Sequence, residues 1–146
     1  MSDSLNIQRW IKFAQRDYDA AYNMSILHHP VPFEIVCYLC QQSVEKILKA
    51  YALAHSEPLV KTHDLKSVLK QCMKYDDEYA AFADFCAVLT EYAIASRYPL
   101  DEDWIEKHDM EVALKNAQEI LSFTKARLLA LGYNNAETEE VEPSKE

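Results

Sequence analysis

The chain has 146 residues, of which 49% are hydrophobic and only one, Gly132, is glycine. This length suits one domain with a substantial core, and the scarcity of glycine excludes strand-rich folds, which need glycine at hairpin turns and bulges. The formal net charge of −9 disfavours non-specific binding to long nucleic acid through overall charge, but it leaves room for a local basic patch.

Apolar side chains recur at three- and four-residue steps along most of the chain, which is typical of amphipathic helices. The pattern predicts five helices, over residues 4–28, 33–55, 64–73, 76–96 and 102–131. In the last of these ranges the face expected to be buried includes Val112, Phe123 and Leu131.

The residues between these ranges favour helix ends. Prolines stop the first, second and fourth helices, at Pro30, Pro58 and Pro99, because the residue before a proline avoids the helical conformation. Gly132 is placed to end the last helix in the C′ position. Thr62 or His63 is expected to cap the third helix, and the acidic residues Asp101, Glu102 and Asp103 suit the N-terminus of the fifth.

The short connections make neighbouring helices antiparallel. We therefore predict an all-α fold, an up-down antiparallel four-helix bundle with one additional short helix, over residues 1–133. Residues 134–146 are predicted to form a disordered acidic tail, because the segment 136–146 holds five Glu, one Lys and no aromatic residue.

The four cysteines are expected to be buried, reduced core residues of a cytoplasmic protein. The N-terminus has no secretory signal pattern, and no apolar run is long enough to span a membrane. Cys37 and Cys40 have the spacing of a metal half-site, but a structural zinc site needs a second pair of ligands, which is missing. We predict no metal and no cofactor.

Most enzyme signatures are absent from the sequence. One glycine cannot form a phosphate-cradling loop or a dinucleotide fingerprint. No Glu is followed by His three positions later, which a di-iron bundle would need.

Three local groupings remain as candidate functional sites: residues 41–50, residues 62–65, and Tyr92 with Arg97-Tyr98-Pro99. Each has an ordinary structural interpretation. Gln42, Lys46 and Lys49 fit a solvated helix face with a Glu45–Lys49 pair at i,i+4. His63 fits a loop residue beside a helix cap, and Arg97 fits the C-terminal end of a helix dipole.

Taken together, these groupings resemble the HEPN domain family. The resemblance rests on the order and spacing of the segments 41–50, 62–65 and 97–99, and on Trp10, Ala14, Asp17 and Ala20-Ala21 in the first helix. It covers residues 10–129, and the Arg-Tyr-Pro motif suggests the nucleotidyltransferase-associated branch.

The resemblance implies a helical bundle that dimerises. It also implies a role in RNA cleavage, in nucleotide binding, or as the partner of a small nucleotidyltransferase in a toxin–antitoxin-like pair. Ribonuclease members carry Arg, four to six residues, then His. Here the next histidine after Arg97 is His108, with ten residues between them, so the ribonuclease motif is not matched.

Two functions follow as hypotheses, with a scaffold that binds no ligand as a third. The favoured one is a homodimeric, non-catalytic or degenerate module that binds a nucleotide or RNA, or docks a nucleotidyltransferase, through Arg97, Tyr98, His63, Lys46 and Lys49. Arginine forms bidentate bonds with phosphate, and tyrosine stacks on bases. The alternative is a metal-independent endoribonuclease in which Arg97 and His108 converge on one phosphodiester.

Overall fold

The chain folds into a bundle of helices. The computed structural model describes residues 2–95 and 105–133, so the predictions about Arg97, Tyr98, the acidic residues 101–103 and the tail lie outside the described residues. The elements are α1 (Ser2–Leu27), α2 (Phe33–Ala54), α3 (Leu65–Met73), a 3₁₀ helix η1 (Asp77–Phe82), α4 (Ala83–Ala95) and α5 (Lys107–Ala130). Residues 2–95 and 105–133 contain no strand, and the predicted all-α fold is confirmed.

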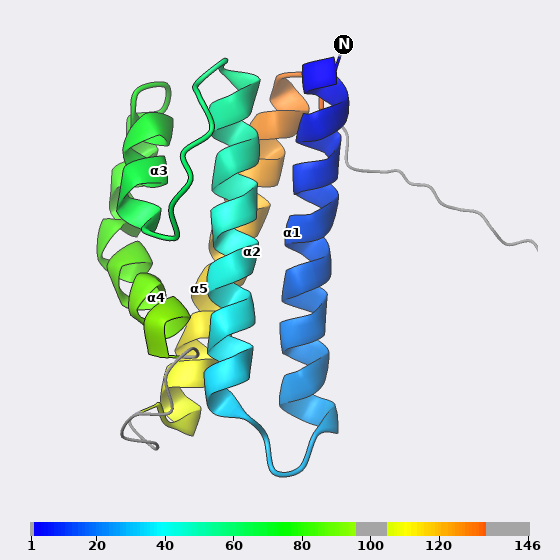
Figure 1. Ribbon diagram of the computed structural model, residues 1–146, viewed down its shortest axis with the longest axis vertical. Coiled ribbons are helices and arrows are strands. Elements are labelled where there is room, and N and C mark those ends of the chain that lie inside the picture. Colours follow the sequence, from blue (N-terminus) through cyan, green and yellow to red (C-terminus); the bar gives the residue numbers. More distant parts are fainter. Residues whose placement is uncertain (1, 96–104, 134–146) are drawn as a thin grey trace, which may run out of the picture.

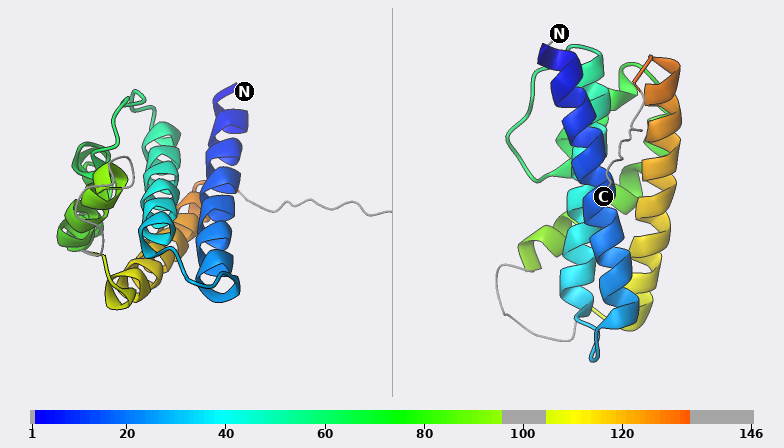
Figure 2. Two further views of the ribbon diagram at one scale, coloured as in Figure 1. Left: turned by 60° about the horizontal axis from the view of Figure 1, so that its bottom comes forward. Right: turned by 90° about the vertical axis from the view of Figure 1, so that its right-hand side faces the viewer.

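The helix α2 is the centre of the bundle. It forms an antiparallel hairpin with α1 and also contacts α3, α4 and α5. Figure 2 shows α3 and α4 on one side of α2 and α1 on the other. α5 runs in the same direction as α2 and also contacts α1 (Figure 1).

The predicted fourth helix differs from the observed one. A single α-helix was expected from residue 76, but its first part is η1, and α4 has only 13 residues. In a 3₁₀ helix, side chains three residues apart point the same way. This geometry lets Tyr79 and Phe82 both pack on Phe123 of α5, with ring centroids 5.0 and 5.3 Å away.

The predicted cap of the third helix and the predicted start of the fifth helix are also wrong. The N-cap of α3 is Asp64, not Thr62 or His63, because its carboxylate accepts a hydrogen bond from the Lys66 backbone N–H at 3.0 Å. The helix α5 begins at Lys107 rather than at residue 102. The Asp109 carboxylate accepts the backbone N–H of Glu106 at 2.8 Å, which stabilises this later start.

Both α2 and α5 end in a Schellman motif. At the end of α5, Gly132 (φ 98°) donates to Leu129 O and Tyr133 donates to Leu128 O, so the predicted C′ role of Gly132 is confirmed. At the end of α2 the same two bonds form around Ser56, which takes a positive φ of 64° without being glycine.

The core contains most of the residues expected there. Val112 and Leu131 are exceptions, since both are exposed. All four cysteines are free and buried, as predicted. Burial raises the pKa of Cys37 and of Cys86 to about 12. No helix among the described residues is long and apolar enough to cross a membrane.

Candidate functional site

A cluster of polar side chains lies at the middle of α2, where the loop before α3 packs against this helix. It consists of Gln41, Glu45 and Lys49 from α2 and His63 from the loop before α3, and we call it the Glu45 cluster. The Glu45 carboxylate accepts hydrogen bonds from Lys49 Nζ at 2.6 Å, from His63 Nδ1 at 3.0 Å and from Gln41 Nε2 at 3.1 Å. One carboxylate therefore holds three side chains from two segments.

The charge on Glu45 is stabilised by these neighbours. Burial alone would raise the pKa of Glu45, but the hydrogen bonds from Lys49, His63 and Gln41 and the charge of Lys49 outweigh it, so the pKa lies below its ordinary value. The carboxylate is ionised and acts as an acceptor. His63 therefore donates through Nδ1, and its other ring nitrogen, Nε2, is the one able to interact with a ligand.

His63 is held in place twice. Gln41 Nε2 also donates to the His63 carbonyl at 3.1 Å, so backbone and ring are both fixed to α2. The first residue of α3, two positions after His63, is anchored to α4, since the Leu65 N–H donates a hydrogen bond to Thr90 Oγ1 at 3.1 Å. The imidazole side chain is nevertheless 48% exposed, whereas that of Glu45 is 7% exposed. The cluster thus presents a rigidly oriented histidine to solvent.

The middle of α1 contacts the same part of α2. Asp17 pairs with Lys46 at 2.5 Å, and the Ala14 carbonyl accepts from Ser43 Oγ at 2.7 Å. Lys49 Nζ lies 5.7 Å from the centroid of the Trp10 ring, within reach of a cation–π interaction. The residues of the first helix and of the segment 41–50 that carry the resemblance to HEPN domains therefore meet in space.

The interpretation of Gln42, Lys46 and Lys49 as a solvated face is wrong for Lys49, which is buried, while Gln42 and Lys46 are half-buried. The Glu45–Lys49 pair exists as predicted, and both of its residues are buried. Neither Gln41 nor the central role of Glu45 was predicted. The available signal was the spacing of three polar residues at i, i+4 and i+8 beside apolar Cys37, Val44 and Leu48.

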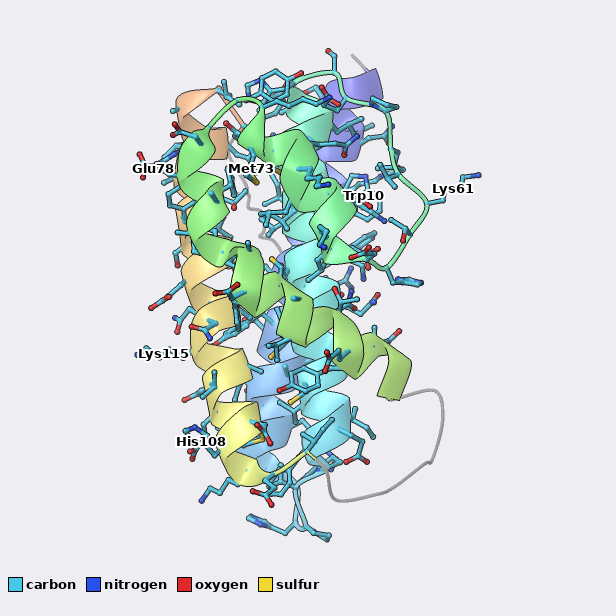
Figure 3. All side chains as sticks on the ribbon, turned by 90° about the vertical axis from the view of Figure 1, so that its left-hand side faces the viewer. Trp10, Lys61, Met73, Glu78, His108 and Lys115 are labelled. Carbon is cyan, nitrogen blue, oxygen red and sulfur yellow. The ribbon has the colours of Figure 1, made fainter. Side chains whose placement is uncertain are left out.

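Among the predicted site residues, the structure brings His63 and Lys49 together on Glu45, whereas Lys46 pairs with Asp17 of α1. Arg97 and Tyr98 lie outside the described residues. His108 is exposed in the first turn of α5, and no described contact joins it to the Glu45 cluster (Figure 3). Within the described part of the chain, no group of three or more His, Cys, Asp or Glu side chains is arranged to hold a metal ion.

Comparison with known proteins identifies one family. Residues 7–128 match the HEPN domain. No curated protein and no solved structure matches the chain. The match spans α1 to α5 and includes the whole Glu45 cluster. The chain therefore belongs to the HEPN domain family.

Proposed function

We propose that this HEPN domain is a non-catalytic, homodimeric module that binds a nucleotide or the end of an RNA. The observation that carries the proposal is the Glu45 cluster, in which a buried carboxylate holds the half-exposed ring of His63 with Nε2 available. A fixed imidazole is a donor to phosphate when Nε2 carries a proton, and its orientation costs no entropy on binding.

Arg97 and Tyr98 complete the proposed site. Arg97 supplies a bidentate phosphate contact and Tyr98 stacks on a base. The charges of Lys46 and Lys49 suggest direct contacts with phosphate, but Lys46 is already paired with Asp17 and Lys49 with Glu45. They orient the site and contribute little free charge to a ligand. The motif Arg97-Tyr98-Pro99 also supports the nucleotidyltransferase-associated branch, with a small nucleotidyltransferase as partner in a toxin–antitoxin-like pair.

Two measurements test the proposal. Mass spectrometry of the purified protein would detect a nucleotide that stays bound through purification. Fluorescence polarisation with a labelled single-stranded RNA of about ten nucleotides would give the affinity. We expect His63→Ala and Arg97→Ala each to weaken binding by about 1.5–3 kcal/mol, the range of a charged hydrogen bond.

Matched controls separate binding from folding. His28→Ala removes an exposed histidine from the end of α1 and should leave the affinity unchanged. If Arg97→Ala instead lowers the unfolding temperature strongly and the intact protein binds neither RNA nor nucleotide, Arg97 is structural and the proposed function is wrong.

The same RNA also tests the endoribonuclease hypothesis. Cleavage of the RNA in the presence of a chelator, with 2′,3′-cyclic phosphate ends, would show metal-independent transesterification. If that activity disappears in both Arg97→Ala and His108→Ala, the protein is an enzyme and the non-catalytic function is refuted. Loss in His63→Ala alone would place the general base in the Glu45 cluster.

A further inference from the structure

The exposed face of α1 carries three cations without a described ion-pair partner. Arg9, Lys12 and Arg16 recur at three- and four-residue steps and are all exposed. No described carboxylate lies within 4.0 Å of any of them, whereas Lys46, which faces α1 from α2, is paired with Asp17. In a chain with 24 acidic residues, this face is a local excess of positive charge.

Two aromatic side chains lie among these cations. Phe13 is 40% exposed, and the Arg16 guanidinium carbon is 5.3 Å from the centroid of its ring. Trp10 is half-buried beside it. Asn6, Arg9, Trp10 and Phe13 line an open depression of about 230 Å³ on the surface of α1. Phe13 thus lies between Arg9 and Arg16 on the exposed side of the helix, and Trp10 and Lys12 lie at the two edges of that side.

This face is continuous with the Glu45 cluster. Trp10 lines the depression, and the centroid of its ring lies 5.7 Å from Lys49 Nζ. Lys49 in turn pairs with Glu45. Figure 3 shows Trp10 on the same side of the molecule as Lys61, in the loop that leads to His63. A ligand that reaches His63 can therefore extend towards α1 along the protein surface.

We propose that Arg9, Trp10, Lys12, Phe13 and Arg16 form a platform for single-stranded RNA. The inference rests on the proposed function, because it extends the same ligand beyond the Glu45 cluster. Bases stack on Phe13 and contact the exposed edge of Trp10, while Arg9, Lys12 and Arg16 neutralise the phosphates between them. Interleaved rings and cations match the alternation of base and phosphate in a single strand. Asn6 adds an amide able to bond with a base edge.

Fluorescence polarisation with the same labelled RNA tests the platform. We expect Phe13→Ala to weaken binding about fivefold or more, through loss of stacking. The double variant Arg9→Glu/Arg16→Glu should weaken it at least about tenfold and reduce the dependence of affinity on salt. The control Lys107→Glu/Lys115→Glu makes the same change in net charge on exposed positions of α5, and it should bind like the wild type.

A second readout reports on Trp10 directly. The chain has two tryptophans, so in a Trp104→Phe background the emission comes from Trp10 alone. RNA should quench this emission in proportion to binding. Circular dichroism and the unfolding temperature of each variant would verify that it is folded.

The outcomes distinguish the two proposals. If RNA binds and depends on His63 and Arg97 but not on Phe13, Arg9 or Arg16, the platform is wrong and the proposed function stands. If binding depends only on α1, the platform stands and the Glu45 cluster is not a ligand site. If the protein binds polyglutamate as tightly as RNA, and Phe13→Ala has no effect on either, the face attracts anions by charge alone and the platform is refuted. Absence of RNA binding by the wild type refutes the platform, and it refutes the proposed function as well if no nucleotide binds either.

Discussion

Lys49 is a cation placed in the interior of a helical bundle, where its charge is compensated by one carboxylate and one aromatic ring. Its side chain is 9% exposed and that of Glu45 is 7% exposed. Removing one partner from such a pair leaves the other charge buried without compensation, which costs far more than an exposed pair contributes.

A double-mutant cycle measures this coupling. Glu45→Gln and Lys49→Met should each lower the free energy of unfolding by about 3 kcal/mol, measured by urea unfolding at neutral pH. The double variant should cost much less than the sum of the two, because no unpaired charge remains. Glu119→Gln, at an exposed position of α5, is the control and should have little effect. Additive losses in the double variant would contradict the interpretation.

The lowered pKa of Glu45 also predicts a dependence of stability on pH. The folded state holds the Glu45 proton less tightly than the unfolded chain, whose carboxyl titrates near its ordinary value of 4.5. The stabilisation by Glu45 is therefore fully present above pH 4.5 and is lost as the pH falls through the lower folded pKa. The difference in unfolding free energy between wild type and Glu45→Gln should shrink between pH 5 and pH 3, in urea titrations at about five pH values in this range. A constant difference would show that Glu45 does not titrate as described.

At this scale the sequence predicts contacts within a helix better than contacts between segments. The Glu45–Lys49 pair followed from the i,i+4 spacing alone. The burial of both residues did not, because it depends on Trp10 of α1 and on the path of the loop that brings His63 back against α2. That path is a tertiary feature with no local pattern.

At the scale of the elements, the ends of the helices were predictable where a residue has a special backbone preference. Gly132 is such a residue, and its role at the end of α5 was predicted. Ser56 occupies the equivalent position at the end of α2 without that preference. The 3₁₀ turn of η1 was not predictable, because it results from the packing of Tyr79 and Phe82 on Phe123.

Substitutions at these two C′ positions should act in opposite directions. Ser56→Gly relieves the cost of a left-handed conformation and should raise the free energy of unfolding by about 0.5–1 kcal/mol. Gly132→Ala introduces the cost of a left-handed conformation for a residue with a β-carbon, and it should lower the free energy of unfolding by about 1 kcal/mol. Apart from Gly132 and its two chain neighbours, no heavy atom lies within 4 Å of the place where a β-carbon at Gly132 would lie, so a clash with the rest of the protein does not complicate the comparison. Thermal unfolding followed by circular dichroism at 222 nm measures both changes. If both substitutions change the stability in the same direction, the Schellman motif does not explain the ends of these helices.

At the scale of the whole molecule, the sequence predicted the fold class and the number of major helices, but not how they surround α2. Short connections predict antiparallel neighbours, yet α2 also packs along α5, which runs in the same direction. Core periodicity shows which side of a helix is buried and does not show against which partner. The dimer that we expect would form through apolar surface that the packing of these helices leaves exposed.

We expect a dimer in solution. Several large apolar side chains stay exposed where α1 ends and α2 begins: Tyr22, Ile26, Leu27 and Ile35. Association would remove them from water. Light scattering at high micromolar concentration should give twice the mass of one chain, and Ile26→Asp should shift the protein towards the monomer. Val112→Asp, an exposed apolar position on α5, is the control. A monomeric wild type would end this prediction.

The four buried thiols can report local unfolding of the helices that cover them. Each cysteine is at most 1% exposed, and Cys37 and Cys40 lie on α2, Cys72 on α3 and Cys86 on α4. Since only an accessible thiolate is alkylated, iodoacetamide can modify each sulfur only after the helix that covers it has opened. We expect Cys72 and Cys86 to be modified before Cys40, because α3 and α4 pack on one side of the central helix. Time-resolved peptide mass spectrometry would then record the order in which the bundle comes apart, and modification of Cys40 as fast as a free thiol would contradict it.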